Sequence, residues 1–311
     1  MKPALVVVGS LNMDFVVSVD RLPSPGETVL GREFKMIPGG KGANQACAAG
    51  KLGGNAVAVR MIGRVGYDVF ADHLKASLSA AGVDVTFVHA TRAQSTGVAL
   101  IWVDRQSQNS IVVASGANHE LAAADVEAMR KVFRGASMAL FQLETPLDTV
   151  EAALKLARQE GATTMLDPAP AQSLPAGLLG QVNILTPNES EALLLCGQPA
   201  GRVTMAEAPA LAAALRRLGP QTVILKMGNQ GCLLLDEAGP RRFPAFPVEV
   251  RDSTAAGDTF NAALAVALTE GKPMEEAIPF ANAAAAISVT RLGAQASAPS
   301  RSEVDAFLAA G

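Results

Sequence analysis

Short runs of β-branched residues alternate with longer Ala- and Leu-rich segments of helical period along most of the chain. Parallel strands need a crossover between them, and that crossover is usually a helix, so this alternation predicts βα units. The fold class expected is therefore α/β, with a doubly wound, mostly parallel sheet flanked by helices. Strands are predicted at Ala4–Val8, Ala56–Met61, Ala139–Gln142, Thr164–Asp167, Asn183–Thr186 and Thr222–Lys226, and helices at Asn44–Leu52, Val69–Ala81, Ala123–Phe133, Leu147–Gln159, Ala206–Leu218, Gly257–Thr269, Met274–Thr290 and Ser302–Ala309.

Two stretches break the alternation, because each contains strand-like runs with no helix between them. The first covers about 14–37, and the second covers about 96–114. Strands joined without a helix pair as hairpins or meanders, so both stretches should leave the main sheet. Together they predict a small antiparallel β lid above the strand ends where ligands of open α/β sheets bind. We expect residues 1–311 to form a single domain that carries this lid.

Charge and composition limit the partners of the chain. The formal net charge of its 311 residues is −3, with acidic and basic residues interspersed, so no basic stripe for nucleic acid is expected. The first apolar run, Ala4–Val8, is too short for a signal peptide or a membrane span. The three cysteines are far apart and suggest neither a disulfide framework nor a zinc site. A reducing cytoplasm and a small-molecule partner are the expectation.

The most informative segment is Asp252–Asn261, which reads DSTAAGDTFN and leads into an apolar helix. Small residues before a helix leave backbone N–H groups exposed at the positive end of the helix dipole. The amides of Ala255, Ala256 and Gly257 could therefore hold negative charge as it develops. Asp258, in the first helical turn, could accept a proton from a hydroxyl placed over that turn. The alternative is that Asp258 only caps the helix.

A second segment, Pro38–Ala46, reads PGGKGANQA at the junction of the first lid stretch and a helix. It is not a Walker A loop, because Gly42 stands where Ser or Thr is required. Glycines such as Gly40 allow a ligand to approach the backbone, while Lys41 and Asn44 supply directed donors for hydroxyl groups. An ordinary loop and helix cap is the alternative interpretation.

A third group of polar residues follows predicted strands. Asn12 and Asp14 come after the first strand, two positions apart, so on an extended chain their side chains point the same way. They could bind adjacent hydroxyls, and Glu144 follows a later strand in a comparable place. An ordinary polar strand end is equally compatible with these residues. No GxGxxG follows the first strand, so a dinucleotide-binding Rossmann fold is disfavoured.

Taken together, these strings resemble the ribokinase family of carbohydrate kinases, from Val6 to about Leu308. Each motif occurs alone elsewhere, but Pro38–Asn44 together with Asp252–Asn261 at this separation is specific. The resemblance implies that ATP donates a phosphoryl group to a sugar hydroxyl, with Asp258 as the catalytic base. It also implies Mg²⁺ on the phosphates, K⁺ as a monovalent activator, and a homodimer formed through the lid.

The resemblance assigns roles to matching positions. The implied sugar-binding residues are Asn12, Asp14, Gly40, Lys41, Asn44, Glu144 and Asp258, and the implied anion hole is Ala255, Ala256 and Gly257. Mg²⁺ and the phosphates are organised through Asn188 and Glu191 of an NxxE element, and the nucleotide through Lys226, Gly228, Gly231 and Asn282. The implied K⁺ site comprises Asp252, Thr254, Ser288, Arg291, Gly293 and Ser297.

Two positions depart from the pattern of the family. Met13 replaces a smaller residue between Asn12 and Asp14, and Lys226 stands where Thr is common, which can add a phosphate contact. The expected reaction is phosphorylation of D-ribose at O5. The alternatives are a related kinase for deoxyribose, fructose or adenosine, and, more distantly, a non-catalytic sugar-binding regulator.

Overall fold

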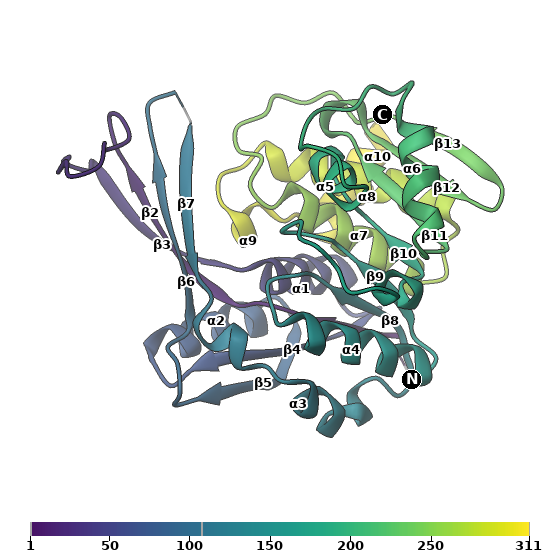
Figure 1. The fold of residues 1–311 in the computed structure, drawn as a ribbon, viewed down its shortest axis with the longest axis horizontal. Coiled ribbons are helices and arrows are strands. Elements are labelled where there is room, and N and C mark those ends of the chain that lie inside the picture. Colours follow the sequence, from purple (N-terminus) through teal and green to yellow (C-terminus); the bar gives the residue numbers. More distant parts are fainter. Residues whose placement is uncertain (1, 107, 311) are drawn as a thin grey trace.

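A computed structural model describes residues 2–106 and 108–310 of the protein. Its main feature is a nine-stranded sheet whose strands run parallel from β11 to β5, with two antiparallel strands added at one edge (Figure 1). In spatial order the strands are β13 (Gly239–Phe243), β12 (Cys232–Asp236), β11 (Thr222–Lys226), β10 (Ile184–Leu185), β9 (Thr163–Leu166), β8 (Ala136–Phe141), β1 (Ala4–Val8), β4 (Ala58–Gly66) and β5 (Val83–Thr91).

Helices cover both faces of this sheet, and β1 shows why. All five residues of β1 are buried, and its side chains alternate between two hydrophobic clusters, as a strand with two covered faces requires. Leu5 and Val7 join the cluster formed with α1 (Lys41–Gly53), α2 (Val69–Ala80), α7 (Ala256–Thr269), α8 (Met274–Val289) and α10 (Arg301–Ala310). Val6 and Val8 join the cluster formed with α3 (Ala123–Ala128), α4 (Leu147–Gln159), α5 (Glu189–Leu195) and α6 (Ala208–Arg217). The predicted α/β class is confirmed.

Several elements were not predicted. β5 was missed because its exposed positions carry polar residues, as befits the last strand of the sheet. The hairpin of β12 and β13 was not predicted, because no helix separates its strands and βα alternation therefore does not indicate it. The helix α5 has seven residues and α9 (Ala294–Ser297) has four, and neither was predicted because so short a segment shows no clear helical period.

A second sheet of four strands stands apart from the main body, at the left of Figure 1. Its order is β3 (Glu33–Gly39), β2 (Asn12–Ser18), β6 (Gly97–Val103) and β7 (Asn109–Ala114). Two antiparallel pairs are joined by a parallel contact between β2 and β6, in which Asn12 lies opposite Gly97. The parallel contact arises because both strands leave the main body in the same direction.

Within the described ranges, no helix combines the length and the apolar character needed to cross a bilayer.

Candidate functional site

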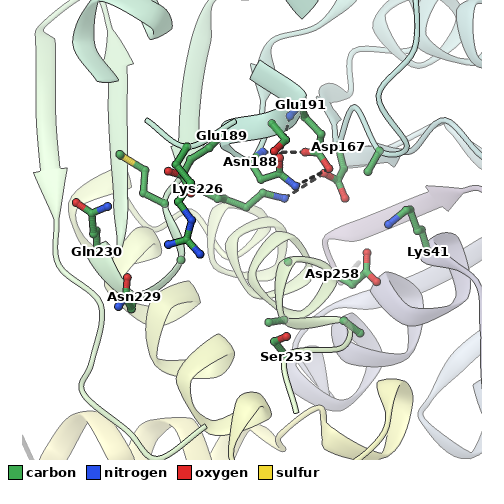
Figure 2. A pocket seen from close by; sticks show the side chains of 18 of the residues that line it. Lys41, Asp167, Asn188, Glu189, Glu191, Lys226, Asn229, Gln230, Ser253 and Asp258 are labelled. Carbon is green, nitrogen blue, oxygen red and sulfur yellow. Dashed lines mark hydrogen bonds and ion pairs between the residues drawn. The ribbon is translucent and has the colours of Figure 1, made fainter. Parts of the chain in front are cut away.

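Several of the polar side chains singled out in the sequence gather where the parallel strands end, beside the amino end of α7: Lys41, Asn188, Glu191, Lys226 and Asp258 (Figure 2). An open cavity of about 680 Å³ lies at this edge of the sheet, which is where open α/β sheets bind their ligands. Its lining comprises Lys41, Asp167, Ala169, Asn188, Glu189, Ser190, Glu191, Gly201, Arg202, Lys226, Met227, Gly228, Asn229, Gln230, Ser253, Ala255, Ala256, Gly257 and Asp258.

The turn before α7 has an unusual backbone. Ala255 has a φ of 57°, in the left-handed region that non-glycine residues rarely adopt. The amide of Ala256 donates to the carbonyl of Ser253 at 3.2 Å, so it is already partly satisfied. Within the described chain, the amides of Ala255 and Gly257 have no hydrogen-bond acceptor. The free donors of the predicted anion hole are thus these two.

Asp258 lies in the first turn of α7, and only 6% of it is exposed. Its Oδ2 accepts a hydrogen bond from Nδ2 of Asn44 at 3.1 Å, and its Oδ1 accepts one from Nε2 of Gln45 at 3.0 Å. Burial raises the pKa of Asp258 to about 6, although the nearby charge of Lys41 acts in the opposite direction. Near neutral pH the carboxylate is therefore mostly ionised but far more basic than an exposed aspartate.

Lys41 begins α1 and lines the cavity near Asp258 (Figure 2). Burial by itself would lower its pKa, but the carboxylates of Asp258, Asp167 and Glu144 outweigh that effect and raise it. The ammonium group therefore stays charged. A permanent positive charge beside a carboxylate base suits a site in which phosphate is transferred.

Asp14 and Glu144 lie close enough to influence each other at the base of the small sheet. Burial, followed by repulsion from Glu144, raises the pKa of Asp14 to about 7. Glu144 follows β8 and accepts hydrogen bonds from the hydroxyl of Ser10 and from the amide of Lys41. Asn12 accepts a hydrogen bond from Nδ2 of Asn118 at 2.7 Å, which holds its amide in place. Neither Ser10 nor Asn118 was identified from the sequence.

Glycines are required where β3 meets α1. A methyl group on Gly39 would lie 2.2 Å from Oδ2 of Asp14, and Gly40 has a φ of 87°. Only glycine allows the Asp14 carboxylate to lie against the backbone at this point. The PGGKG string thus shapes a surface for Asp14.

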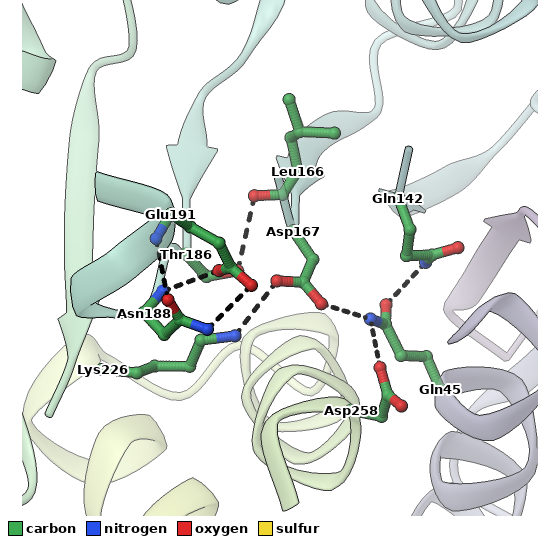
Figure 3. Close-up of polar contacts among 9 residues, drawn as sticks. All are labelled: Gln45, Gln142, Leu166, Asp167, Thr186, Asn188, Glu191, Lys226 and Asp258. Carbon is green, nitrogen blue, oxygen red and sulfur yellow. Dashed lines mark hydrogen bonds and ion pairs between the residues drawn. The ribbon is translucent and has the colours of Figure 1, made fainter. Parts of the chain in front are cut away.

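A chain of polar contacts runs along the cavity wall and includes three residues to which the sequence gave no role in the site, Asp167, Gln45 and Gln142 (Figure 3). Nζ of Lys226 donates to Oδ1 of Asp167 at 3.1 Å, and Nε2 of Gln45 donates to Oδ2 of Asp167 at 3.0 Å. The same Nε2 contacts Asp258, and Oε1 of Gln45 accepts from Gln142. Asp167 directly follows β9, and an acidic residue after a buried strand is the signal that could have identified it.

Asn188 and Glu191 form a reciprocal cap at the amino end of α5. The side chain of Asn188 accepts from the amide of Glu191 at 2.9 Å, and Glu191 accepts from the amide of Asn188 at 2.8 Å. Burial raises the pKa of Glu191, against the influence of Lys226. The NxxE element is therefore a helix cap whose carboxylate also lines the cavity.

The remaining predicted nucleotide residues lie at the end of β11 and beyond. Gly228 lines the cavity and has a φ of 54°, and Gly231 has a φ of 87° where a methyl group would lie 2.1 Å from the carbonyl oxygen of Phe243. Nδ2 of Asn282 donates to the carbonyl of Pro244 at 3.0 Å. Gly231 and Asn282 do not line the cavity.

The predicted K⁺ residues come together from two segments. Asp252 accepts hydrogen bonds from the amides of Gly293 and Thr254, both at 2.9 Å, and these contacts lower its pKa against the effect of burial. The hydroxyls of Ser288 and Ser297 donate to the carbonyls of the residues three positions before them, and Arg291 pairs with Glu303.

Sequence and structure comparisons identify the relatives of this chain. A model of the pfkB family of carbohydrate kinases matches residues 2–301. Ribokinase from Haemophilus influenzae is 41% identical over 99% of both chains, and deoxyribokinase from Salmonella typhimurium is 34% identical over 98% of both. A solved structure of Arabidopsis thaliana ribokinase, complexed with ribose and ATP, has a TM-score of 0.92 and 35% identity over 99% of both chains. A full-length match of this strength shows that the chain belongs to the pfkB family of carbohydrate kinases.

Proposed function

We propose that this kinase transfers the γ-phosphoryl group of ATP to O5 of D-ribose, giving D-ribose 5-phosphate and ADP. The observation that carries the proposal is the buried Asp258 carboxylate beside the free amides of Ala255 and Gly257, in a cavity that also holds two lysines. The ribokinase relatives and the Arabidopsis structure with ribose and ATP support ribose as the acceptor.

In the proposed reaction the O5 oxygen attacks the γ-phosphorus while the bond to the ADP oxygen breaks. Asp258 accepts the proton that O5 loses as its bond to phosphorus forms. A pKa of about 6 suits this role, because the carboxylate is ionised near neutrality and still binds a proton well. The amides of Ala255 and Gly257 and the ammonium of Lys41 face the negative charge of the transferred group.

Sugar binding is assigned to Asn12, Asp14, Gly40, Lys41, Asn44 and Glu144. Asp14 and Glu144 offer carboxylate acceptors for hydroxyl groups, and the Gly39 and Gly40 backbone allows them to lie against the sugar. The nucleotide is assigned to the cavity beyond Asp258, with Lys226 and Gly228 on its wall. Gly231 and Asn282 would support this wall from behind.

Mg²⁺ fits the acidic part of the cavity. In the described ranges no group of three or more His, Cys, Asp or Glu side chains forms a metal cage. Mg²⁺ commonly keeps several waters and binds one or two carboxylates together with substrate phosphates. Glu191, held by Asn188, is the carboxylate that we assign to it. When bound, the ion would neutralise charge on the phosphates.

The two segments joined by Asp252 fit a K⁺ site made of oxygens. The hydroxyl oxygens of Ser288 and Ser297 retain lone pairs that can coordinate a cation. The carbonyl of Thr254 lies in the turn that leads to α7, so K⁺ would order this turn without joining the chemistry. Activity that is higher in potassium chloride than in sodium chloride is expected. Equal rates in the two salts would contradict the site.

The four-stranded sheet is proposed to act as the lid of a single domain and as the interface of a homodimer. Asp14 faces the site, so the adjacent Phe15 lies on the opposite face of the sheet. A row of apolar residues crosses all four strands on that face: Met36, Phe15, Leu100 and Val112. Met36, Leu100 and Val112 are 42–56% exposed, which a second copy of the sheet could cover.

A cytoplasmic location is proposed on chemical grounds. Cys47, Cys196 and Cys232 are all free thiols, as proteins of a reducing compartment usually have.

A second candidate substrate is 2-deoxy-D-ribose, because a deoxyribokinase is among the relatives. Met13, fully buried between Asn12 and Asp14, is a residue that could reshape the sugar pocket. An ADP-release assay with D-ribose, 2-deoxy-D-ribose, D-fructose and adenosine separates the candidates. We expect D-ribose to give the highest kcat/KM. A higher value for another acceptor would reassign the substrate, and sugar binding without ADP release would indicate a regulator.

A further inference from the structure

Two buried carboxylates share a single amide group beneath the cavity. Nε2 of Gln45 lies 3.0 Å from Oδ2 of Asp167 and 3.0 Å from Oδ1 of Asp258. Gln45 is fully buried, and Asp167 is 4% exposed. Asp167 follows β9, whereas Asp258 lies in α7, on the opposite side of the site. Gln45 therefore links two elements that are far apart in the sequence.

The orientation of the Gln45 amide follows from its neighbours. Two carboxylate oxygens can accept only if the NH₂ group faces them, and one hydrogen is available for each. Its Oε1 points the other way and accepts from Nε2 of Gln142 (Figure 3). Turning the amide over would place its oxygen against two carboxylate oxygens, which are all acceptors. Hydrogen bonding therefore fixes the orientation of the Gln45 amide.

Lys226 extends the same network to the phosphate side of the cavity. Its ammonium donates to Oδ1 of Asp167 at 3.1 Å, which leaves two further N–H groups. A methyl group placed on Gly257 would lie 3.3 Å from this nitrogen. The ammonium therefore lies beside the free amides at the start of α7, where phosphate is expected to bind.

A buried ion pair is a poor means of stabilising a fold, because desolvation offsets most of its attraction. The pair of Asp167 and Lys226 is therefore better explained by what it positions. Asp167 accepts from Lys226 with one oxygen and from Gln45 with the other, so a movement that displaces one hydrogen bond also displaces the other.

We propose that Asp167 and Gln45 are positioning residues that hold the phosphate-contacting ammonium of Lys226 and the base Asp258 in fixed relation to each other. This inference rests on the proposed kinase function. The four side chains form one unit that spans the transfer: Lys226 faces the phosphate, Asp258 faces the attacking hydroxyl, and Asp167 with Gln45 sets the distance between them.

Asp167→Asn tests the unit directly. Asparagine has an NH₂ group in place of one carboxylate oxygen, so a donor would face either Lys226 or Gln45, and one of the two hydrogen bonds would be lost. We expect kcat to fall by about 10²-fold, the scale of misplaced catalytic groups, and ATP affinity to weaken at least about 10-fold. KM for the sugar should stay within about threefold of the wild-type value.

Gln45→Leu separates the two halves of the unit, because the contact between Lys226 and Asp167 remains. We expect a similar loss of kcat with ATP affinity unchanged. Lys155→Met and Gln198→Leu change exposed residues outside the site and should behave as wild type.

A double-mutant cycle decides whether the residues act together. Lys226→Met leaves the buried Asp167 unpaired and could unfold the protein, whereas Asp167→Asn/Lys226→Met removes both charges. We expect the double variant to lose no more kcat than the more impaired single variant. Losses that multiply, or an Asp167→Asn enzyme with wild-type kcat and ATP affinity, would overturn the unit. Thermal melting curves confirm which variants are folded.

ATP affinity, measured by calorimetry without sugar, makes this test independent of the substrate. If the wild-type enzyme ignores ribose, the proposed function fails, while the effect of Asp167→Asn on ATP binding is still decisive. If Asp167→Asn binds ATP as tightly as the wild type, the positioning role is wrong, even if the enzyme phosphorylates ribose.

Discussion

Asp258 combines near-complete burial with two amide donors, and this combination determines its chemistry. Burial favours the neutral acid, while Asn44 and Gln45 hold the two oxygens in defined directions. A carboxylate that only capped a helix would accept the backbone amides of the first helical turn, as Asp68 does at the start of α2. The surroundings of Asp258 therefore favour its role as a base.

Asp258→Asn should lower kcat by at least about 10²-fold, because the variant cannot accept the proton from the attacking hydroxyl. Sugar affinity should change little, since asparagine has a similar volume. Steady-state kinetics and sugar titrations measure both quantities. Asp72→Asn, an exposed residue on α2, is the matched control. Turnover near the wild-type level in Asp258→Asn would remove the assigned role.

The pH dependence of kcat should report the same group. Only ionised Asp258 can act as the base, and its pKa is raised from 3.8 to about 6, so kcat should fall about tenfold per pH unit below about 6. Lys41 and Asp167 are the charged groups that act on it, Lys41 lowering and Asp167 raising its pKa. Saturating sugar separates this effect from the titration of Asp14, whose pKa is about 7. A kcat that is flat down to pH 5 would contradict the assignment.

At the scale of elements, the start of α7 is built from a strained turn and a helix that follows it directly. Ala255 takes a left-handed conformation that costs about 1–2 kcal/mol for a residue with a Cβ. The strain turns free amides toward the cavity. Strain of this kind persists only where the surrounding structure determines it, and here the segment bearing Asp252 is tied to Gly293.

Ala255→Gly should raise the free energy of unfolding by about 0.5–1 kcal/mol, because glycine adopts this backbone conformation without strain. Ala256→Gly, one position later and inside the helix, should instead lower it by up to about 1 kcal/mol. Urea denaturation of the two variants gives the comparison. Equal shifts of the same sign would show that the turn is not strained.

At the scale of the whole molecule, the small sheet presents apolar side chains that the rest of the chain leaves exposed. Val112 is 56% exposed in the middle of β7. If a second copy covers this sheet, Val112→Asp should place a charge in the interface and convert dimer to monomer.

Val69→Asp is the matched control, because Val69 is 75% exposed but lies on α2 outside the small sheet. Sedimentation velocity distinguishes the two states at equal protein concentration. A wild-type protein that sediments as a monomer, or a Val112→Asp variant that remains dimeric, would contradict an interface formed through this sheet.

The sequence by itself determined the α/β class and the local motifs of the site. Apolar runs that alternate with segments of helical period predict strands and helices, because a strand covered by helices on both faces of its sheet is apolar throughout. The turn before α7 and the glycines around Lys41 are local features, so their residue types could be recognised in the string. Asp258, Lys41 and Asn44 were found in this way, and the structure places them together.

Only the tertiary structure brought Asp167 and Gln45 to Asp258. Gln45 lies 122 positions from Asp167 and 213 from Asp258 along the chain, so no periodicity or spacing relates them. The parallel pairing of β2 with β6 was not predicted for the same reason, since tertiary packing decides which distant strands pair. Each helix and strand depends largely on local sequence, so it can be predicted from the sequence. Which side chains meet depends on long-range packing, and the pKa of a buried carboxylate depends in turn on those neighbours.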